Sequence, residues 1–382
     1  MIRVFADDLT GAAELAGMCK QHGLNAILAF VPSAHDDTEA IVYCTDSRSM
    51  DLASALTVTQ QFLAPISSAS DGMVYKKTDS VLRGHIREEL LLQMHQFGYQ
   101  RVLFIPQNPS MGRVIRDGQY FVSGKLLSET AFAHDPEFPR NTSDVVDMLS
   151  GHDAEVHVMH YDDSLPATGI IVGEASCWED LEQWVSRIDH GMLLAGGGDF
   201  FQAILHHHYG TAMPAVLPSP KQPFLYISGT SFQSAVSFIQ ALAVENDMVH
   251  YIDGPILEGI GIENWLSHCA KAINESKRAV IAFDPSLQHQ DSYSALFLRQ
   301  KMASIIHALL SLTPVGEILI EGGSTAKAIL DEMNLPFWVP DAVIGRGVVR
   351  LQDAHQNYTI TVKPGSYPLP DDIAAIFSNT SH

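Results

Sequence analysis

Two adjacent carboxylates, Asp7 and Asp8, are the first residues of the chain whose types suggest chemistry. They follow the apolar run 2–5 and precede Gly11 and the helix-like stretch 12–19, which is the pattern of a strand, a turn and a helix. Neighbouring carboxylates repel each other, so the pair is costly unless it binds a partner such as a hydroxyl-rich substrate or a metal ion. The alternative is that one of the two only caps the helix.

A second polar group at positions 77–80 contains one cation, one carboxylate and two hydroxyls: Lys77, Thr78, Asp79 and Ser80. It follows another apolar run, and a helical pattern begins a few residues later. The amino end of a helix offers N–H donors and a positive dipole, which favour an anion. The alternative is that Asp79 or Ser80 caps the helix and that the lysines are solvated.

Two further segments of the first half carry arginines. The segment 45–49 follows an apolar run that ends at Cys44, and its Arg48 could bind a carboxylate with two parallel hydrogen bonds. A surface salt bridge is the alternative for Arg48. The long segment 108–144 is rich in Gly, Pro, Arg and Asp and lacks periodicity, and it includes Arg113. We expect a loop that lies over the site and excludes water, or else an ordered excursion without function.

The second half of the chain contains three turns built from glycine and hydroxyl residues, at 228–231, 321–325 and 363–366. Glycine lets the backbone approach a polyphosphate, and hydroxyls and backbone N–H groups hydrogen-bond it. None of the turns matches GxxxxGK[ST] or GxGxxG, so each is a weak signal by itself. Together they favour a nucleotide site, and three small-residue turns without function are the alternative.

The elements that must position these turns are short apolar runs that alternate with helical patterns. This alternation predicts an α/β fold with mostly parallel sheets flanked by helices, in which the turns lie at the carboxyl ends of the strands. The predicted strands are 2–5, 26–30, 40–44, 73–75, 102–105, 169–172, 192–195, 224–227, 279–283, 317–320 and 359–362. Predicted helices include 12–19, 53–63, 86–95, 178–188, 233–244, 295–310 and 326–333.

A proline-rich segment at 214–223 separates two halves that each show this alternation. We therefore expect two domains, at 1–215 and 224–382, and the length of 382 residues agrees with two. The net charge of -21 argues against nonspecific binding to nucleic acid or to an anionic membrane. No apolar stretch approaches the ~20 residues of a membrane span, and no leader is recognised, so we expect a cytoplasmic protein. The four cysteines form no CxxC pair, so we expect reduced thiols and no metal centre.

Taken together, these motifs resemble those of the four-carbon acid sugar kinases, and the resemblance spans both halves of the chain. The segment 6–17 (ADDLTGAAELAG) is more similar to the D-threonate kinase branch than to the 3-oxo-tetronate branch. The matching segments are Ala6–Ala12, Lys77–Gly84, Gly112–Pro136, Gly322–Thr325 and Lys363–Gly365.

The resemblance implies that the first domain binds the acid sugar and that the second binds ATP, with the active site in the cleft between them. Arg48 and Lys77 are expected to bind the substrate carboxylate, and Asp8 and Asp79 to hold hydroxyls as the catalytic candidates, with Asp8 preferred as the base. The acid-binding candidates are Asp8, Arg48, Lys77, Thr78, Asp79, Ser80, Arg83 and Arg113. The nucleotide-binding candidates are Ser228, Ser231, Gly322, Gly323, Ser324, Thr325 and Gly365.

The expected reaction is transfer of a phosphoryl group from ATP, with Mg²⁺, to the 4-hydroxyl of a sugar acid, most simply D-threonate. D-Erythronate, L-threonate and 3-oxo-tetronate stay open as substrates. Two other classes also stay open: a sugar-acid sensor without catalysis, and a dehydrogenase, against which the lack of GxGxxG counts. The sequence does not decide between a monomer and a homo-oligomer.

Overall fold

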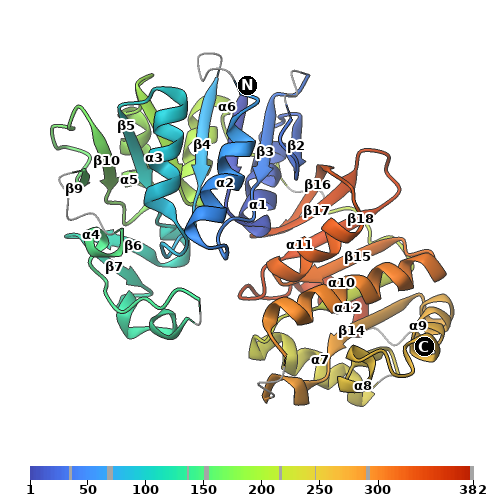
Figure 1. Ribbon diagram of the computed structural model, residues 1–382. Coiled ribbons are helices and arrows are strands. Elements are labelled where there is room, and N and C mark those ends of the chain that lie inside the picture. Colours follow the sequence, from blue (N-terminus) through green and yellow to red (C-terminus); the bar gives the residue numbers. More distant parts are fainter. Residues whose placement is uncertain are drawn as a thin grey trace. The chain divides into compact units, whose positions relative to one another are not determined.

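The short apolar runs of the sequence form strands, and helices lie between many of them (Figure 1). The computed structural model describes residues 1–33, 37–66, 72–135, 137–149, 155–214, 217–245, 247–289 and 293–378. The chain divides into two compact units, Met1–Pro214 and Ala215–His382. Positions 215 and 216 of the expected linker lie outside the described residues, and so does Pro136 of the long segment.

The first unit is built on a parallel sheet whose strands are buried on both faces, which explains why they read as continuous apolar runs. Its order is β2 (Ala26–Ala29), β3 (Ala40–Cys44), β1 (Ile2–Ala6), β4 (Met73–Lys77), β11 (Met192–Gly196), β5 (Arg101–Ile105), β10 (Gly169–Gly173) and β9 (Val156–Met159).

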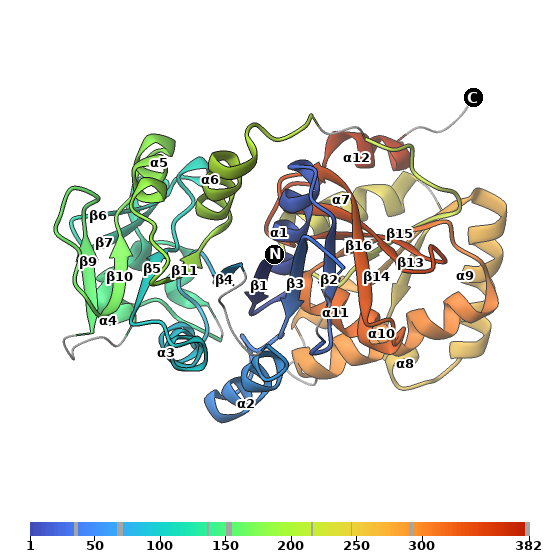
Figure 2. The same ribbon diagram turned by 90° about the horizontal axis from the view of Figure 1, so that it is seen from above.

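Helices cover both faces of this sheet (Figure 2). On one face lie α2 (Leu52–Leu63) and α3 (Ile86–Phe97), and on the other lie α1 (Leu9–Gln21), α5 (Trp178–Ser186) and α6 (Gly198–Tyr209). Successive side chains of a strand point to opposite faces of the sheet, so they pack against these two helix layers in turn. Phe5 of β1 packs towards Phe97 of α3, whereas Tyr75 of β4 packs against Phe201 of α6 with ring centroids 4.9 Å apart.

The sheet register brings three of the predicted turns to one edge. Ala6, the last residue of β1, is opposite Cys44 of β3 on one side and Lys77 of β4 on the other. The chain leaves β1 towards β2, whereas it leaves β4 towards β5 on the other side of the sheet. The loops after β1 and β4 therefore diverge, which is where open α/β sheets bind ligands.

The long segment 108–144 was expected as a loop, and this expectation was wrong in part. It contains a small antiparallel sheet of β6 (Arg113–Arg116), β7 (Gln119–Val122) and β8 (Lys125–Leu126). The turns between these strands are Asp117-Gly118 and Ser123-Gly124, and all four residues have positive φ. Such pairs are typical of two-residue hairpins, but strands of two to four residues are too short to show a period.

The second unit has a sheet that is parallel except at one side. The parallel part runs β13 (Val249–Ile252), β14 (Arg278–Phe283), β12 (Phe224–Ser228), β15 (Glu317–Glu321) and β18 (Thr359–Lys363). The antiparallel hairpin of β17 (Val348–Asp353) and β16 (Phe337–Gly345) continues it and was not predicted. The predicted class, a mostly parallel α/β sheet flanked by helices, is confirmed.

Helices also flank both faces of the second sheet (Figure 2). α7 (Gln233–Glu245) and α12 (Asp371–Ser378) share a buried apolar cluster with the strands, in which Phe377 contacts Phe224 and Tyr226. The opposite face carries α10 (Ala295–Leu312) and α11 (Gly323–Glu332), with α9 (Ile262–Ser276) packed against α10. Within the described part of the chain, no helix combines the length and the apolar character needed to cross a bilayer.

Candidate active site

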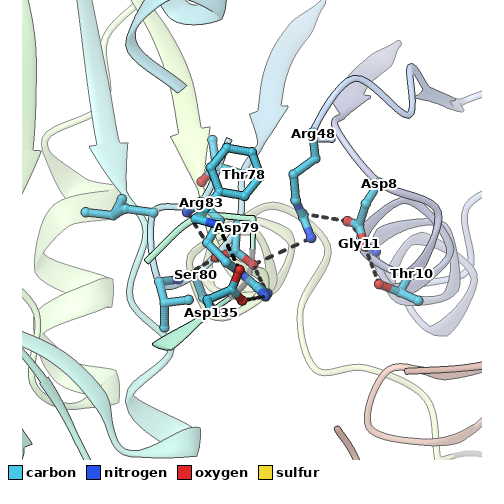
Figure 3. Close-up of polar contacts among 12 residues, drawn as sticks. Asp8, Thr10, Gly11, Arg48, Thr78, Asp79, Ser80, Arg83 and Asp135 are labelled. Carbon is cyan, nitrogen blue, oxygen red and sulfur yellow. Dashed lines mark hydrogen bonds and ion pairs between the residues drawn. The ribbon is translucent and has the colours of Figure 1, made fainter. Parts of the chain in front are cut away.

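Arg48 joins the turns that follow β1 and β4 (Figure 3). Its Nε donates to Asp7 Oδ2 at 2.9 Å, and its Nη2 donates to Asp7 Oδ1 and to Asp8 Oδ1, both at 2.8 Å. Its Nη1 lies 3.6 Å from Asp79 Oδ1. The side chain is only 16% exposed, so the alternative of a surface salt bridge does not hold. Arg48 is what lets the two adjacent carboxylates coexist.

Asp8 is the N-cap of α1 and also belongs to this cluster. Its carboxylate accepts from the Gly11 N–H at 3.1 Å and from the Thr10 hydroxyl. Burial alone would raise the pKa of Asp8, but Arg48, Lys77 and the Thr10 hydrogen bond outweigh it and hold the pKa below its ordinary value. The capping interpretation is therefore correct for Asp8 but incomplete, because the same ionised carboxylate also contacts Arg48.

Asp79 is held by the residues that follow it in the chain. It accepts from Arg83 Nε at 3.0 Å and Nη2 at 2.8 Å, and from the backbone N–H groups of Val81 and Arg83. Burial would raise the pKa of Asp79, but Arg83 and Arg48 keep it far below its usual range. Neither Asp79 nor Ser80 caps α3, because that helix begins at Ile86 after His85.

Lys77 and Thr78 keep hydrogen-bonding capacity for a ligand. The Lys77 ammonium is buried and donates to the Thr78 carbonyl at 2.9 Å, the one hydrogen bond it makes to the described residues, although it can make three. The buried Thr78 Oγ1 has no partner among the described residues. A Cβ at position 11 would lie 2.7 Å from Asp8 Oδ1 and 3.0 Å from Lys77 Nζ, so Gly11 keeps the space between these groups.

The segment 108–144 contacts the turn after β4. Arg113 Nη1 donates to the Ser80 hydroxyl, and Arg83 Nη1 donates to Asp135 Oδ2 at 3.0 Å. The guanidinium carbons of Arg83 and Arg113 lie 5.8 and 5.7 Å from the centre of the Phe132 ring. Asp135 belongs to the segment that was expected to lie over the site, but neither it nor Phe132 was among the acid-binding candidates, since only the tertiary structure brings them to the turn. Whether this segment excludes water stays a prediction.

In the second unit a pocket of about 320 Å³ opens at the carboxyl ends of β12 and β15. The chain leaves β12 towards β13, away from β15, so this edge is again a point where loops diverge. Four of the predicted nucleotide-binding residues line the pocket: Ser228, Ser231, Ser324 and Thr325. Its other lining residues are Gly229, Thr230, Val236, Ile239, Tyr251, Ala282, Phe283, Pro285, Leu287, Tyr293, Ala295, Leu298 and Arg299.

The predicted Gly322, Gly323 and Gly365 do not line this pocket, but they lie next to residues that do. Gly322 has φ +107° and precedes α11, for which the described residues provide no side-chain cap, so the N–H groups of the first turn from Gly323 onward lack a partner within the helix. A Cβ on Gly365 would lie 2.3 Å from the Thr230 hydroxyl oxygen, and one on Gly229 would lie 2.1 Å from Thr325 Oγ1. The close approach of these three loops therefore depends on residues without side chains.

The apolar part of the pocket was not anticipated. It is formed by Tyr251 of β13, Phe283 of β14 and Leu298 of α10, and none of these residues belongs to a recognisable motif. Lys363 lies beside the predicted turns, but its ammonium already has three partners in the protein. It contacts Glu321 at 2.5 Å and donates to the carbonyls of Pro364 at 3.0 Å and Tyr367 at 2.6 Å. Lys363 therefore holds the ends of β15 and β18 together.

Within the described ranges of the chain, no group of three or more His, Cys, Asp or Glu side chains is placed to hold a metal ion. The acidic residues of the two sites are paired with cations, as in Asp7 with Arg48 and Glu321 with Lys363. These residues do not fit a resident Mg²⁺ site. The four cysteines are free thiols, of which Cys177 is exposed.

The depressed pKa of Asp79 predicts a loss of stability in acid. The unfolded chain protonates this carboxyl near its ordinary value of 3.8, whereas the folded chain keeps it ionised to lower pH. The stabilisation is thus present above that value and is lost as the pH falls below it. We expect the unfolding temperature of the natural chain to fall from about pH 5 to about pH 3, and that of Asp79→Asn to start lower and fall less. If thermal melts show the same fall in unfolding temperature with pH for both chains, this prediction is wrong.

The chain matches one family model and several known proteins. A family model described as a sugar-binding N-terminal domain matches residues 2–235, more than half of the chain. The chain is 29% identical over 150 residues to a D-threonate kinase of Salmonella typhimurium, covering 38% of this chain and 36% of that protein. It is 30% identical over 153 residues to a 3-oxo-tetronate kinase of Pectobacterium atrosepticum, covering 38% and 36%.

These two matches span about a third of each relative's length. A 3-oxo-tetronate kinase of Haemophilus influenzae is 28% identical over 406 residues, covering 97% of this chain and 98% of that one. A solved structure of a Haemophilus influenzae protein has a TM-score of 0.74 at 19% identity, covering 98% and 99% of the two chains. One from Salmonella typhimurium has a TM-score of 0.80 at 18% identity and covers 98% of each. At these identities the two structures show the fold alone.

Proposed function

Because the chain belongs to the four-carbon acid sugar kinase family through its sugar-binding N-terminal domain, we propose that it transfers a phosphoryl group from ATP to the 4-hydroxyl of a four-carbon sugar acid. The proposed substrate is D-threonate and the product is 4-phospho-D-threonate. Relatives named D-threonate kinase and 3-oxo-tetronate kinase support the class of substrate. The observation that carries the proposal is the cluster at one sheet edge of the buried Lys77 and Asp79 with the partly buried Asp8 and Arg48.

The acid is proposed to bind at this edge of the first unit. Arg48 and Lys77 supply the positive charge for the substrate carboxylate. Lys77 is proposed as the main contact of that carboxylate, because Nε and Nη2 of Arg48 already contact Asp7 and Asp8. The unpartnered hydroxyl of Thr78 suits a substrate hydroxyl or carboxylate. The site is proposed to include Ser80, Arg83 and Arg113 as well. Arg113 of the segment 108–144 contacts Ser80, and Arg83 contacts Asp135 of the same segment.

Asp8 is proposed to accept the hydrogen bond of the attacking 4-hydroxyl. Its low pKa keeps it ionised and so always able to accept, although it also makes Asp8 a weak base. Phosphoryl transfer tolerates a weak base because the transition state is loose, and alignment and charge matter more than early proton removal. Asp79, held by Arg83 and Arg48, is proposed to orient a second hydroxyl.

The nucleotide is proposed to bind the pocket of the second unit. Its phosphates would contact the first turn of α11 and the hydroxyls of Ser228 and Ser231, close to Gly365, and its base would occupy the apolar part near Tyr251 and Leu298. Mg²⁺ would enter as a component of the MgATP substrate. Transfer requires the γ-phosphate of ATP to reach the hydroxyl that the first unit is proposed to hold.

The test is a screen of sugar acids for release of ADP. With MgATP we expect D-threonate to stimulate ADP release and to yield a phosphorylated acid, seen by mass spectrometry. D-Erythronate, L-threonate and 3-oxo-tetronate in parallel assign the substrate. If every four-carbon acid fails to release ADP, the kinase proposal is wrong. Binding of an acid by calorimetry without turnover would then support the sensor.

A further inference from the structure

A buried polar cluster lies beneath the candidate acid site, on the side of the first sheet that α2 and α3 cover. Its centre is Glu89 of α3, which is 2% exposed, and its ionic partner is Lys76 of β4, which is fully buried. Strand alternation explains the position of Lys76, because it points to the face opposite to that of its neighbour Lys77. None of the catalytic or binding roles assigned above uses Glu89.

The Glu89 carboxylate contacts three different elements. Oε1 accepts from the Ser47 hydroxyl, in the turn after β3, and from Thr59 Oγ1 of α2 at 3.1 Å. Oε2 pairs with the Lys76 ammonium. Thr45 extends the cluster, since its Oγ1 lies 2.9 Å from Ser47 Oγ and donates to the carbonyl of Ala6, the last residue of β1, at 3.0 Å. One carboxylate thus links the turn after β3, α2 and β4.

Two of these partners directly precede residues of the site. Ser47 precedes Arg48, and Lys76 precedes Lys77. A change in the Ser47 contact would therefore shift the backbone that carries Arg48, and a change in the Lys76 contact would shift the backbone that carries Lys77. A well-packed apolar pair could fill the same volume at similar or greater stability, so stability alone does not explain a buried ion pair here. Connected polar groups in a low dielectric do specify a single geometry.

We propose that Glu89 is a positioning residue that sets the places of Arg48 and Lys77 relative to each other. It acts through Ser47 and Lys76 and does not touch the substrate. The identity of the ligand that benefits, a sugar acid, rests on the proposed function, but the link from Glu89 to Arg48 does not.

The kinetic test separates geometry from stability with two double variants. Lys76→Met/Glu89→Leu removes the pair and the carboxylate that accepts from Ser47, whereas Lys76→Met/Glu89→Gln removes the charges but keeps a carbonyl acceptor. We expect the Leu variant to raise the KM for the acid about tenfold or more, with the KM for ATP unchanged. The Gln variant should recover most of that loss. If both variants show the KM values of the natural chain, Glu89 is only structural.

A matched control exists in the second unit. Glu317 and Arg350 form a buried pair at 3.0 Å, and Glu317 also accepts from the Thr361 hydroxyl at 3.0 Å. Glu317 is the first residue of β15, at the end opposite to the nucleotide turn. Arg350→Met/Glu317→Leu should leave the KM for the acid unchanged even where it lowers the unfolding temperature. A rise equal to that of the Lys76/Glu89 variant would mean that lost stability alone causes the effect, and the proposal would be overturned.

A second readout does not depend on turnover. The Nε–H of Arg48 donates to the buried Asp7 at 2.9 Å, so ¹⁵N-arginine NMR should show it as a slowly exchanging signal, assigned with Arg48→Lys. Ser47→Ala removes one hydroxyl and keeps the ion pair, so it tests the link even if the double variants do not fold. We expect Ser47→Ala to shift this signal or speed its exchange. An unchanged signal would disprove the link, whereas failure of all acids in the ADP screen would disprove only the kinase.

Discussion

Replacement of Asp8 by asparagine is expected to lower kcat about 100-fold or more, the scale for a positioned acid–base group. Asparagine keeps the size of the side chain and one acceptor oxygen but removes the negative charge that strengthens the hydrogen bond from the substrate hydroxyl. The loss should be larger in kcat than any rise in KM, because the interaction strengthens as the hydroxyl attacks. Steady-state kinetics with saturating MgATP and the acid identified in the screen measure both constants.

The fold should survive this change, because asparagine caps helices as well as aspartate does. Asp51→Asn is the matched control: Asp51 caps α2 in the same way, accepting from the Ser54 N–H at 3.0 Å, but it is exposed and is not part of the cluster. Its kcat should be that of the natural chain. A normal kcat with a raised KM in Asp8→Asn would make Asp8 a binding residue, and Asp79 would become the candidate base.

Replacement of Gly323 by valine is expected to raise the KM for ATP at least about tenfold, equivalent to about 1.4 kcal/mol, and to leave binding of the acid unchanged. Gly323 is the first residue of α11, where no side chain caps the free N–H groups that are proposed to bind phosphate. A branched side chain there would keep the phosphates away from the backbone. Calorimetry with a non-hydrolysable ATP analogue measures the binding directly.

Glu332→Val is the control, because it introduces the same β-branched residue at the last position of the same helix. The side chain of Glu332 is exposed. It should bind the analogue as the natural chain does. If folded Gly323→Val also binds with unchanged affinity, the nucleotide site lies elsewhere than the start of α11.

The sequence was a good guide to the turns that follow strands. Apolar runs such as 2–5 and 73–75 are local signals, because strands buried on both faces need continuous apolar residues. Parallel connection then requires that the turns after them lie at one edge, and the register of Ala6 against Cys44 and Lys77 confirms this. The short strands β6–β8 were missed because two to four residues show no period, and the hairpin β16–β17 was missed because Pro340 and two register shifts interrupt the pattern of β16.

The sequence by itself determined which chemical groups stand at the strand ends, because an alternating α/β pattern and the polar residues that interrupt it are both read along the chain. The tertiary structure alone decided what each group contacts. It placed Arg48 against Asp7 and Asp8, brought Tyr251 and Leu298 to one pocket, and set Glu89 beneath Arg48 and Lys77. The reason is physical: hydrogen bonds, ion pairs and the pKa values that depend on them act over a few ångströms in space, between residues tens of positions apart in sequence.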